Sequence, residues 1–301
     1  MNQNVKGHIF GIAAVLLWST AGTAFKLSLR ITDAMSLVVY SAVFSFVVFA
    51  AAVFFRGRVD ELRKLSVKNY IRSAFLGLLN PFLYYCILFA AYDRLLAQEA
   101  LVLNYTWPIV LVVLSSFAAR TFPGVKTVIA FGISFSGAVL VAAGDSIGSF
   151  RFDDPLGVSL AAGSSILWAF YWLINKQDKT SASVRMFLNF GFGSIYSLIL
   201  LIVIGRLRIP SAGVMLGAGY IGLFEMGLTF LLWLSALRLV DTPVRISNLV
   251  FISPFLSLVW IHLVVGEPLF VTTMLGLVFI VTGIIVQKVS PSLLRSGKTP
   301  Q

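Results

Sequence analysis

Residues 100–119 read ALVLNYTWPIVLVVLSSFAA, twenty positions without a charged side chain. At about 1.5 Å of rise per residue, a helix of this length crosses a hydrocarbon core of roughly 30 Å. Its middle holds Asn104, Trp107 and Pro108, which are spaced i, i+3 and i+4 and therefore share one helix face. A lipid-facing helix gains nothing from an asparagine, and a proline removes a backbone hydrogen bond. We expect this face to form a polar and aromatic wall inside a helical bundle.

The composition of the whole chain points to the same class of protein. The 301 residues are 58% hydrophobic and 12% charged, whereas soluble domains carry about 25% charged residues. The first apolar segment runs on as a full-length span without a cleavage site, so it does not resemble a signal peptide. We therefore predict an all-α integral membrane protein with ten transmembrane helices, near residues 9–29, 34–55, 73–92, 98–119, 127–144, 156–175, 186–205, 212–236, 246–265 and 269–287.

The basic residues predict how these spans are oriented. The net charge of +11 could suggest a nucleic-acid partner, but the lysines and arginines lie at span ends and form no soluble patch, so we expect none. With the N-terminus inside, 17 of the 23 basic residues fall in inside segments and 6 fall outside. The positive-inside rule then predicts a multi-pass protein of the cell inner membrane with both termini in the cytoplasm.

The chain divides into two similar halves. Several pairs of residues recur with matched or nearly matched spacing in both, in the same order: Trp18–Lys26 with Trp168–Lys176, Gly77–Ala91 with Gly222–Ala236, and Pro108–Gly137 with Pro254–Gly283. We interpret residues 1–145 and 155–290 as two copies of a five-helix unit. Because five is odd, the second copy enters the membrane from the opposite side. Such inverted repeats are typical of secondary transporters with a site near mid-membrane.

Four strings in the chain resemble a known family. They are LLWST at 16–20, LVLNYTWP at 101–108, LWAFYWLINK at 167–176 and the pair Gly266-Glu267. Together they resemble the EamA-type members of the drug/metabolite transporter (DMT) superfamily, and the first two also resemble its aromatic amino acid exporter branch. The resemblance implies a ten-helix inner-membrane carrier that exports small metabolites such as amino acids by alternating access. One departure is that Arg120-Thr121 stands where the first unit often has an acidic residue.

Glu225 is the one acidic residue near the centre of a span. A charge at mid-bilayer is costly, so this side chain should face the bundle interior. It could exchange a proton, pair with a substrate amine, or serve as a structural hydrogen-bonding group. Its counterpart in the first half is Asn80. Thr229 should continue the face of Glu225, and Tyr84 that of Asn80.

Three tryptophans, at positions 18, 107 and 168, lie well inside their spans, where an interfacial belt does not explain them; packing and ligand contact are both open. We expect the helix breaks at Pro108 and Pro254 to face a shared cavity with Asn104. Lys26 and Lys176 should reach the two membrane surfaces. The candidate substrate-binding residues are therefore Trp18, Asn80, Tyr84, Asn104, Trp107, Pro108, Trp168, Glu225, Thr229 and Pro254.

Other functions find less support in the sequence. There are two histidines, one cysteine, Cys86, and no paired acids, metal-ligand cluster or phosphate loop, so we expect no catalytic residues, no metal and no cofactor. An integral membrane enzyme remains the least favoured alternative. A passive channel for small polar solutes also needs a polar lumen, and it stays open as the main alternative. The expected partners are a small-molecule substrate, with coupling to protons as one option, and the lipid bilayer.

Overall fold

The computed structural model describes residues 2–121, 124–142, 154–175, 180–240 and 249–288. These residues form helices and connecting turns, without a β-strand among them. Eight helical segments are long and apolar enough to cross a membrane, and two shorter apolar segments, Val250–Val265 and Val271–Gln287, bring the number to ten. The prediction of an all-α, ten-helix membrane protein is confirmed.

The first five-helix unit contains two continuous spans and three interrupted ones. Its elements are α1 (Gln3–Ser19) with α2 (Ala21–Leu29), α3 (Ala34–Phe55), the short surface helix α4 (Val59–Arg63), α5 (Val67–Gly77) with η1 (Leu78–Leu83) and α6 (Tyr84–Arg94), α7 (Ala97–Asn104) with α8 (Trp107–Ala118), and α9 (Val125–Ala142).

The second unit repeats this order, except that its first span is continuous. Its elements are α10 (Pro155–Asn175), α11 (Ala182–Val203), α12 (Ala212–Tyr220) with η2 (Ile221–Leu228) and α13 (Thr229–Leu239), η3 (Val250–Ile252) with α15 (Ser253–Trp260) and η4 (Ile261–Val265), and α16 (Val271–Lys288). Most of the segment between the two predicted units, residues 146–154, lies outside the described residues, as does Lys176.

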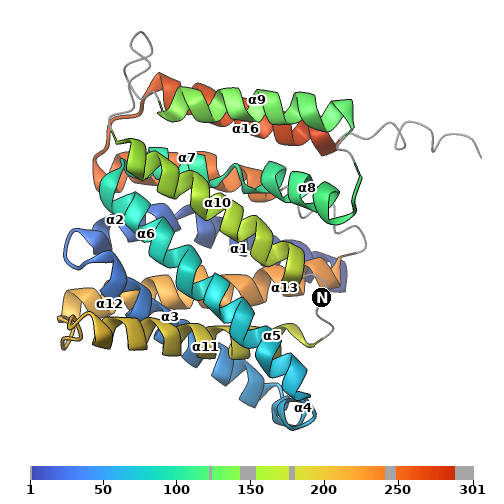
Figure 1. Ribbon diagram of the computed structural model, residues 1–301, viewed down its shortest axis with the longest axis vertical. Helices are drawn as coiled ribbons and strands as arrows, with labels where there is room; N and C mark the ends of the chain where they lie inside the picture. The colour runs from blue at the N-terminus through green and yellow to red at the C-terminus, as the bar shows by residue number, and fades with distance from the viewer. Residues whose placement is uncertain (1, 122–123, 143–153, 176–179, 241–248, 289–301) are drawn as a thin grey trace, which may run out of the picture.

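The contacts between the two units are reciprocal, because each unit uses equivalent spans to contact the other. Helix α1 of the first span packs on α13 of the eighth, and α10 of the sixth packs on α6 of the third. The second and seventh spans, α3 and α11, pack on each other, and so do the fifth and tenth, α9 and α16. Figure 1 shows the pair α9 and α16 at one edge of the bundle and α3 and α11 at the opposite edge. The arrangement is that of two related units facing each other.

Two equivalent glycines permit close approach of the third span to α11 and of the eighth span to α3. A Cβ atom added at Gly77 would meet the backbone of Asn189 and Gly193 on α11, and one added at Gly222 would meet the backbone of Ser41 and Ser45 on α3. Residues with a side chain could not bring the two backbones so near. The sequence match between Gly77 and Gly222 therefore reflects the same helix crossing made once by each unit.

The breaks inside spans leave backbone carbonyls that accept hydrogen bonds from side chains. The first span is interrupted at Thr20, and the free carbonyl of Ser19 accepts a hydrogen bond of 2.7 Å from Ser257 Oγ on α15. The fourth span is interrupted just before Pro108, and Thr106 Oγ1 donates to Leu103 O in the turn. In a membrane such breaks are tolerated only where protein or water supplies partners, so both lie in the bundle interior.

Polar contacts join helix ends at one end of the bundle. Lys26 Nζ donates to the carbonyl oxygens of Tyr92 (2.8 Å) and Leu95 (2.6 Å) at the end of α6. Glu267, only 6% exposed, accepts a 2.9 Å hydrogen bond from Ala97 N at the start of α7. Each charge thus compensates the free backbone groups of a helix terminus. The structure adds the partners of Lys26, whose ammonium, expected near the membrane surface, is held by carbonyl oxygens at the end of α6.

The two units share one backbone feature at the ends of the fourth and ninth spans. Gly266 has φ +82°, and Arg120, its counterpart by sequence, has φ +53°. Both residues therefore end their helices in the left-handed conformation, which suits glycine and strains arginine. The matching position proposed from sequence is structurally equivalent, although its side chain differs.

The side chain of Asp33 caps the N-terminus of α3. Its side chain accepts hydrogen bonds from Met35 N and Ser36 N, both 3.1 Å long. Burial alone would raise the pKa of this carboxyl group, but the hydrogen bonds from Ser36 and Met35 and the charge of Arg206 together hold the pKa below its ordinary value. Near its ordinary pKa this carboxyl group therefore binds more protons in the unfolded chain than in the folded one. Its contribution to the unfolding free energy is complete above about pH 4 and is lost as the pH falls through the lowered pKa.

We expect Asp33→Ala to lose the helix cap and to lower the unfolding free energy by about 1 kcal/mol at pH 7. Asp33→Asn keeps an acceptor and should lose less. Thermal unfolding of the purified variants in detergent measures both effects. The deficit of Asp33→Asn should shrink between pH 7 and pH 3.5; a deficit that stays constant over this range would contradict the role given to the charge.

Candidate functional site

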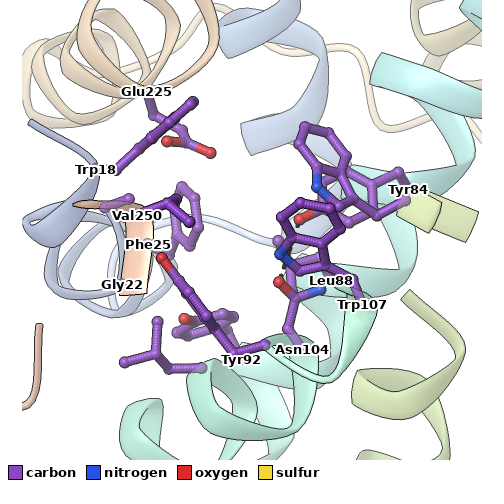
Figure 2. Close-up of a pocket in the computed structure, with 14 residues that line it drawn as sticks. Trp18, Gly22, Phe25, Tyr84, Leu88, Tyr92, Asn104, Trp107, Glu225 and Val250 are labelled. Atoms are coloured by element: carbon purple, nitrogen blue, oxygen red, sulfur yellow. Dashed lines mark hydrogen bonds between the residues drawn. The ribbon is translucent and has the colours of Figure 1, made fainter. Parts of the chain in front are cut away.

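A small cavity lies at the centre of the bundle, where the two units meet. Its volume is about 80 Å³, and it is lined by residues from the first, third, fourth, sixth, eighth and ninth spans. Six of the residues that the sequence predicted to form the site lie on its wall: Trp18, Tyr84, Asn104, Trp107, Trp168 and Glu225. Figure 2 shows Glu225 and Trp18 on one side of the space, with Tyr84, Trp107 and Asn104 across from them.

Glu225 reaches this cavity from η2, a stretch of π-helix inside the eighth span. The residue is 9% exposed, and its Oε1 accepts a 3.1 Å hydrogen bond from the hydroxyl of Tyr85 on α6. Its second oxygen, Oε2, is buried without a hydrogen-bond partner among the described residues. A buried carboxyl oxygen without a partner is costly, which favours a role in binding a proton or a ligand over a purely structural one.

A second polar group on the wall comes from the break in the fourth span. Asn104, the last residue of α7, accepts a long hydrogen bond of 3.4 Å from the hydroxyl of Tyr84. Its amide nitrogen donates to Ser164 Oγ on α10 at 2.8 Å. These bonds fix the orientation of the amide and tie the third, fourth and sixth spans together at mid-depth. The polar wall predicted from residues 100–119 is thus assembled where the helix is interrupted.

Aromatic rings make up most of the remaining wall. Tyr84 stacks on Trp168 with a centroid distance of 4.5 Å and an interplanar angle of 29°. Trp18 lies edge-on to Phe230 at 5.9 Å. These contacts hold the tryptophans in place while their remaining surface lines the cavity, so packing and ligand contact, which the sequence left open, are compatible.

A second, larger cavity of about 670 Å³ continues from the first. The two share Trp18, Trp107, Trp168 and Val250 as lining residues. The larger cavity also reaches residues at the ends of α10 and α13 and near the start of α11, among them Asn175, Arg238 and Arg185. Its wall includes Pro108, beside the break in the fourth span.

This larger cavity extends toward the end of the bundle that holds α4. The carboxylate of Glu61 on α4 accepts a 2.8 Å hydrogen bond from Ser181 N at the start of α11, which places these elements together. Lys26 and Glu267 lie at the opposite end, where they line neither of the two cavities. The larger cavity thus lies between the central site and the end that holds α4.

Three predicted site residues are placed elsewhere. Asn80, Thr229 and Pro254 are buried but do not line either of these two cavities. Asn80 has an extended backbone (φ −146°, ψ 121°) inside η1, and Thr229 Oγ1 donates to the carbonyl of Phe224. Pro254 lies at the start of α15, so it does mark a helix break, but it does not line the cavity that Pro108 lines.

The cavity also contains residues that the sequence analysis did not select. Phe25 and Tyr92 line the small cavity, and Tyr85 is the hydrogen-bond partner of Glu225. Tyr85 directly follows Tyr84, and the pair of tyrosines in an apolar span was the available signal. The described residues contain no group of three histidine, cysteine or acidic side chains that could hold a metal ion.

Comparisons with known proteins agree with this architecture. A curated relative from Clostridium kluyveri, an uncharacterized transporter, is 29% identical over 171 residues, or 53% of this chain and 53% of the relative. The chain thus matches about half the length of that relative. A solved crystal structure of a protein superposes with a TM-score of 0.66 at 22% identity, covering 97% of this chain and all of the other, which shows a shared fold.

The family comparison is the most extensive. The profile of the EamA-like transporter family matches residues 5–143 and again residues 155–287. Each match takes in one of the two five-helix units that pack against each other in the structure. With both units matched over nearly their whole length, the chain belongs to the EamA-like transporter family.

Proposed function

We propose that this protein is a secondary transporter that exports amino acids or related small metabolites across the inner membrane by alternating access. The observation that carries the proposal is the central cavity at the junction of two related units, beside a larger cavity that reaches toward one end of the bundle. Rocking of two such units around a fixed site exposes it to each side in turn. A continuous pore through the protein would need both ends open at once.

The orientation of the protein follows from its charges. The end that holds α4 carries most of the basic residues, so we place it in the cytoplasm, together with both termini. On this assignment the larger cavity faces the cytoplasm, and the structure represents an inward-facing state that is ready to load substrate for export. Basic Arg185 and Arg238 line the cavity wall on this side.

Coupling to protons is part of the proposal and rests on Glu225. Among the described residues that line the small cavity, Glu225 is the one with a carboxyl group. Because its side chain sits where the two units meet, it would be exposed to the opposite membrane face when the units rock. A group that takes up a proton on one side and releases it on the other couples substrate movement to the proton gradient.

Counterflow in proteoliposomes tests whether the protein is a carrier. Vesicles are loaded with one unlabelled metabolite from a panel of amino acids and related amines, and the uptake of the same labelled compound is followed without any pH gradient. A carrier should show a transient accumulation of label for its substrates. The binding site brings labelled substrate in and returns to the outside with unlabelled substrate bound. Simple equilibration at a rate that internal substrate does not change would instead indicate a channel.

Cysteine labelling tests the orientation. In a background with Cys86→Ala, cysteines introduced at Ser66 and Ser181, which begin α5 and α11, should react with a membrane-impermeant maleimide only from the cytoplasmic side. A cysteine at Ile209, which is 98% exposed between α11 and α12, should react only from outside. The same outside labelling is expected at Ser149, which lies outside the described residues. Labelling of positions 181 and 209 from the same side would contradict the topology.

A further inference from the structure

The charges around the central cavity limit what it can bind. Glu225 is the only acidic residue on the described wall, and no lysine, arginine or histidine lies there. The other titratable side chains around it are tyrosines: Tyr85, which donates to Glu225, and Tyr84, Tyr92 and Tyr105 on the wall. A ligand group that balances the charge of Glu225 must therefore be a cation.

The shape and chemistry of the wall suit one kind of cation. Oε2 of Glu225 is more than nine-tenths buried and has no hydrogen-bond partner among the described residues, so it can accept from an N–H donor. Trp18, Trp107 and Trp168 line the same space, and aromatic rings attract cations, particularly where water is excluded. A single carboxylate among aromatic rings favours an ammonium group over a metal ion, which would need several oxygen ligands.

The two cavities differ in size and would hold different parts of a ligand. A volume of about 80 Å³ holds a charged head group with one or two attached carbons, since a water molecule occupies about 30 Å³ of liquid. The larger cavity of about 670 Å³ continues from it past the three tryptophans and can hold the remainder of a small metabolite. The wall of the small cavity offers no basic group that would recognise a carboxylate.

We propose that this protein recognises its substrates by a protonated amino group bound between Glu225 and the tryptophans, and that a carboxylate on the substrate is dispensable. The proposal rests on the proposed transport function and narrows it: amines without a carboxyl group are bound as well as amino acids, and acids without an amino group are not. Oε2 can hold a proton or face an ammonium ion, but not both. Substrate and proton therefore compete for one site, which is the requirement for exchanging one against the other.

Binding to the purified protein in detergent, measured by isothermal titration calorimetry, tests this with three compounds of one skeleton. Phenethylamine has the amino group only, phenylalanine has both groups, and 3-phenylpropionate has the carboxylate only. We expect the first two to bind with similar affinity and the third to bind at least tenfold more weakly. Glu225→Gln should weaken the binding of both amines by about tenfold or more, because a charge-assisted hydrogen bond becomes a neutral one.

The matched control is Asp60→Asn, which removes an acidic charge from α4 at the protein surface and should leave all three affinities unchanged. Lowering the pH from 8 to 5 should weaken amine binding in the wild type and have little effect in Glu225→Gln. Binding of 3-phenylpropionate as strong as that of the amines overturns the proposal. So does failure of phenethylamine to bind, or unaltered amine binding by a correctly folded Glu225→Gln variant.

This test separates the site from the transport function, because binding in detergent requires no flux. Amine binding as predicted, together with absent counterflow, would contradict the proposed transport function and support the amine-binding site. Counterflow of amino acids, together with binding that does not depend on the amino group, would contradict the amine-binding site and support the transport function.

Discussion

Glu225→Gln is expected to reduce proton-driven transport to the level of empty liposomes. Glutamine keeps the size of the side chain and can still accept from the hydroxyl of Tyr85, which lies 3.1 Å from Oε1 in the wild type. It cannot take up or release a proton, so substrate movement loses its coupling to the gradient. Driven uptake into proteoliposomes with an imposed pH gradient measures the loss, and counterflow without a gradient should survive in part.

Two comparisons make the result specific. Tyr85→Phe removes the hydrogen bond to Glu225 but leaves the carboxyl group, so it should slow driven transport without abolishing it. Asp60→Asn removes an acidic charge from the surface helix α4 and should transport like the wild type. Driven flux of Glu225→Gln that equals the wild-type flux at several pH values would show that Glu225 is structural, since a protonated carboxyl and an amide then act alike.

Leucine at Gly77 or Gly222 is expected to prevent folding of the protein. At both positions an added Cβ would meet backbone atoms of the facing helix, which cannot move aside as a flexible side chain could. Even alanine should cost about 1–3 kcal/mol at each site, as overpacking does in tight cores. The variants should elute as aggregates in size-exclusion chromatography, and the alanine forms should unfold at lower temperature.

Gly163 provides the control for this experiment. It lies within α10, and an added Cβ there would meet no atom within 4 Å. Gly163→Leu should therefore fold, and Gly163→Ala should be neutral or slightly stabilising because alanine favours helix more than glycine does. A Gly222→Leu variant that folds as well as Gly163→Leu would contradict the close crossing of η2 on α3.

The fold was accessible from the sequence because membrane spans leave strong local signals. Apolar length located the ten helices, and matched spacing of residues such as Gly77 and Gly222 revealed the two units before any contact was known. Asn104 and Pro108 could be assigned to the interior for a physical reason, since neither an amide nor a helix break is tolerated against lipid. Such features are set by single helices and by the membrane around them, independently of the tertiary structure.

The details of the site were less accessible, chiefly because the helix is irregular at η1 and η2. Regular helix geometry would place Tyr84 on the face of Asn80 and Thr229 on the face of Glu225, each four residues on. In η1 the backbone of Asn80 is extended and kinks the helix, and in η2 the helix is the wider π form, so residues four apart no longer share a face. Tyr84 and Glu225 thus line the cavity, while Asn80 and Thr229 do not.

Contacts between distant segments were also beyond a pattern-based prediction. Tyr85 and Glu225 are separated by 140 positions, and Lys26 and Leu95 by 69. Each side chain looked plausible in several roles on its own helix, and nothing in the sequence around Lys26 indicated that the end of α6 lies beside it. Only the packing of the two units selects among such roles.

The most direct test of a proton-coupled carrier is accumulation of substrate against its own gradient. Proteoliposomes containing the purified protein are given an acidic interior and a neutral exterior, and the internal concentration of a labelled substrate found by counterflow is followed over time. The account predicts that the internal concentration rises above the external one, and that a protonophore collapses it to equality. Equal concentrations on both sides, reached at a rate that neither the pH gradient nor the protonophore alters, would contradict the account and indicate a passive channel.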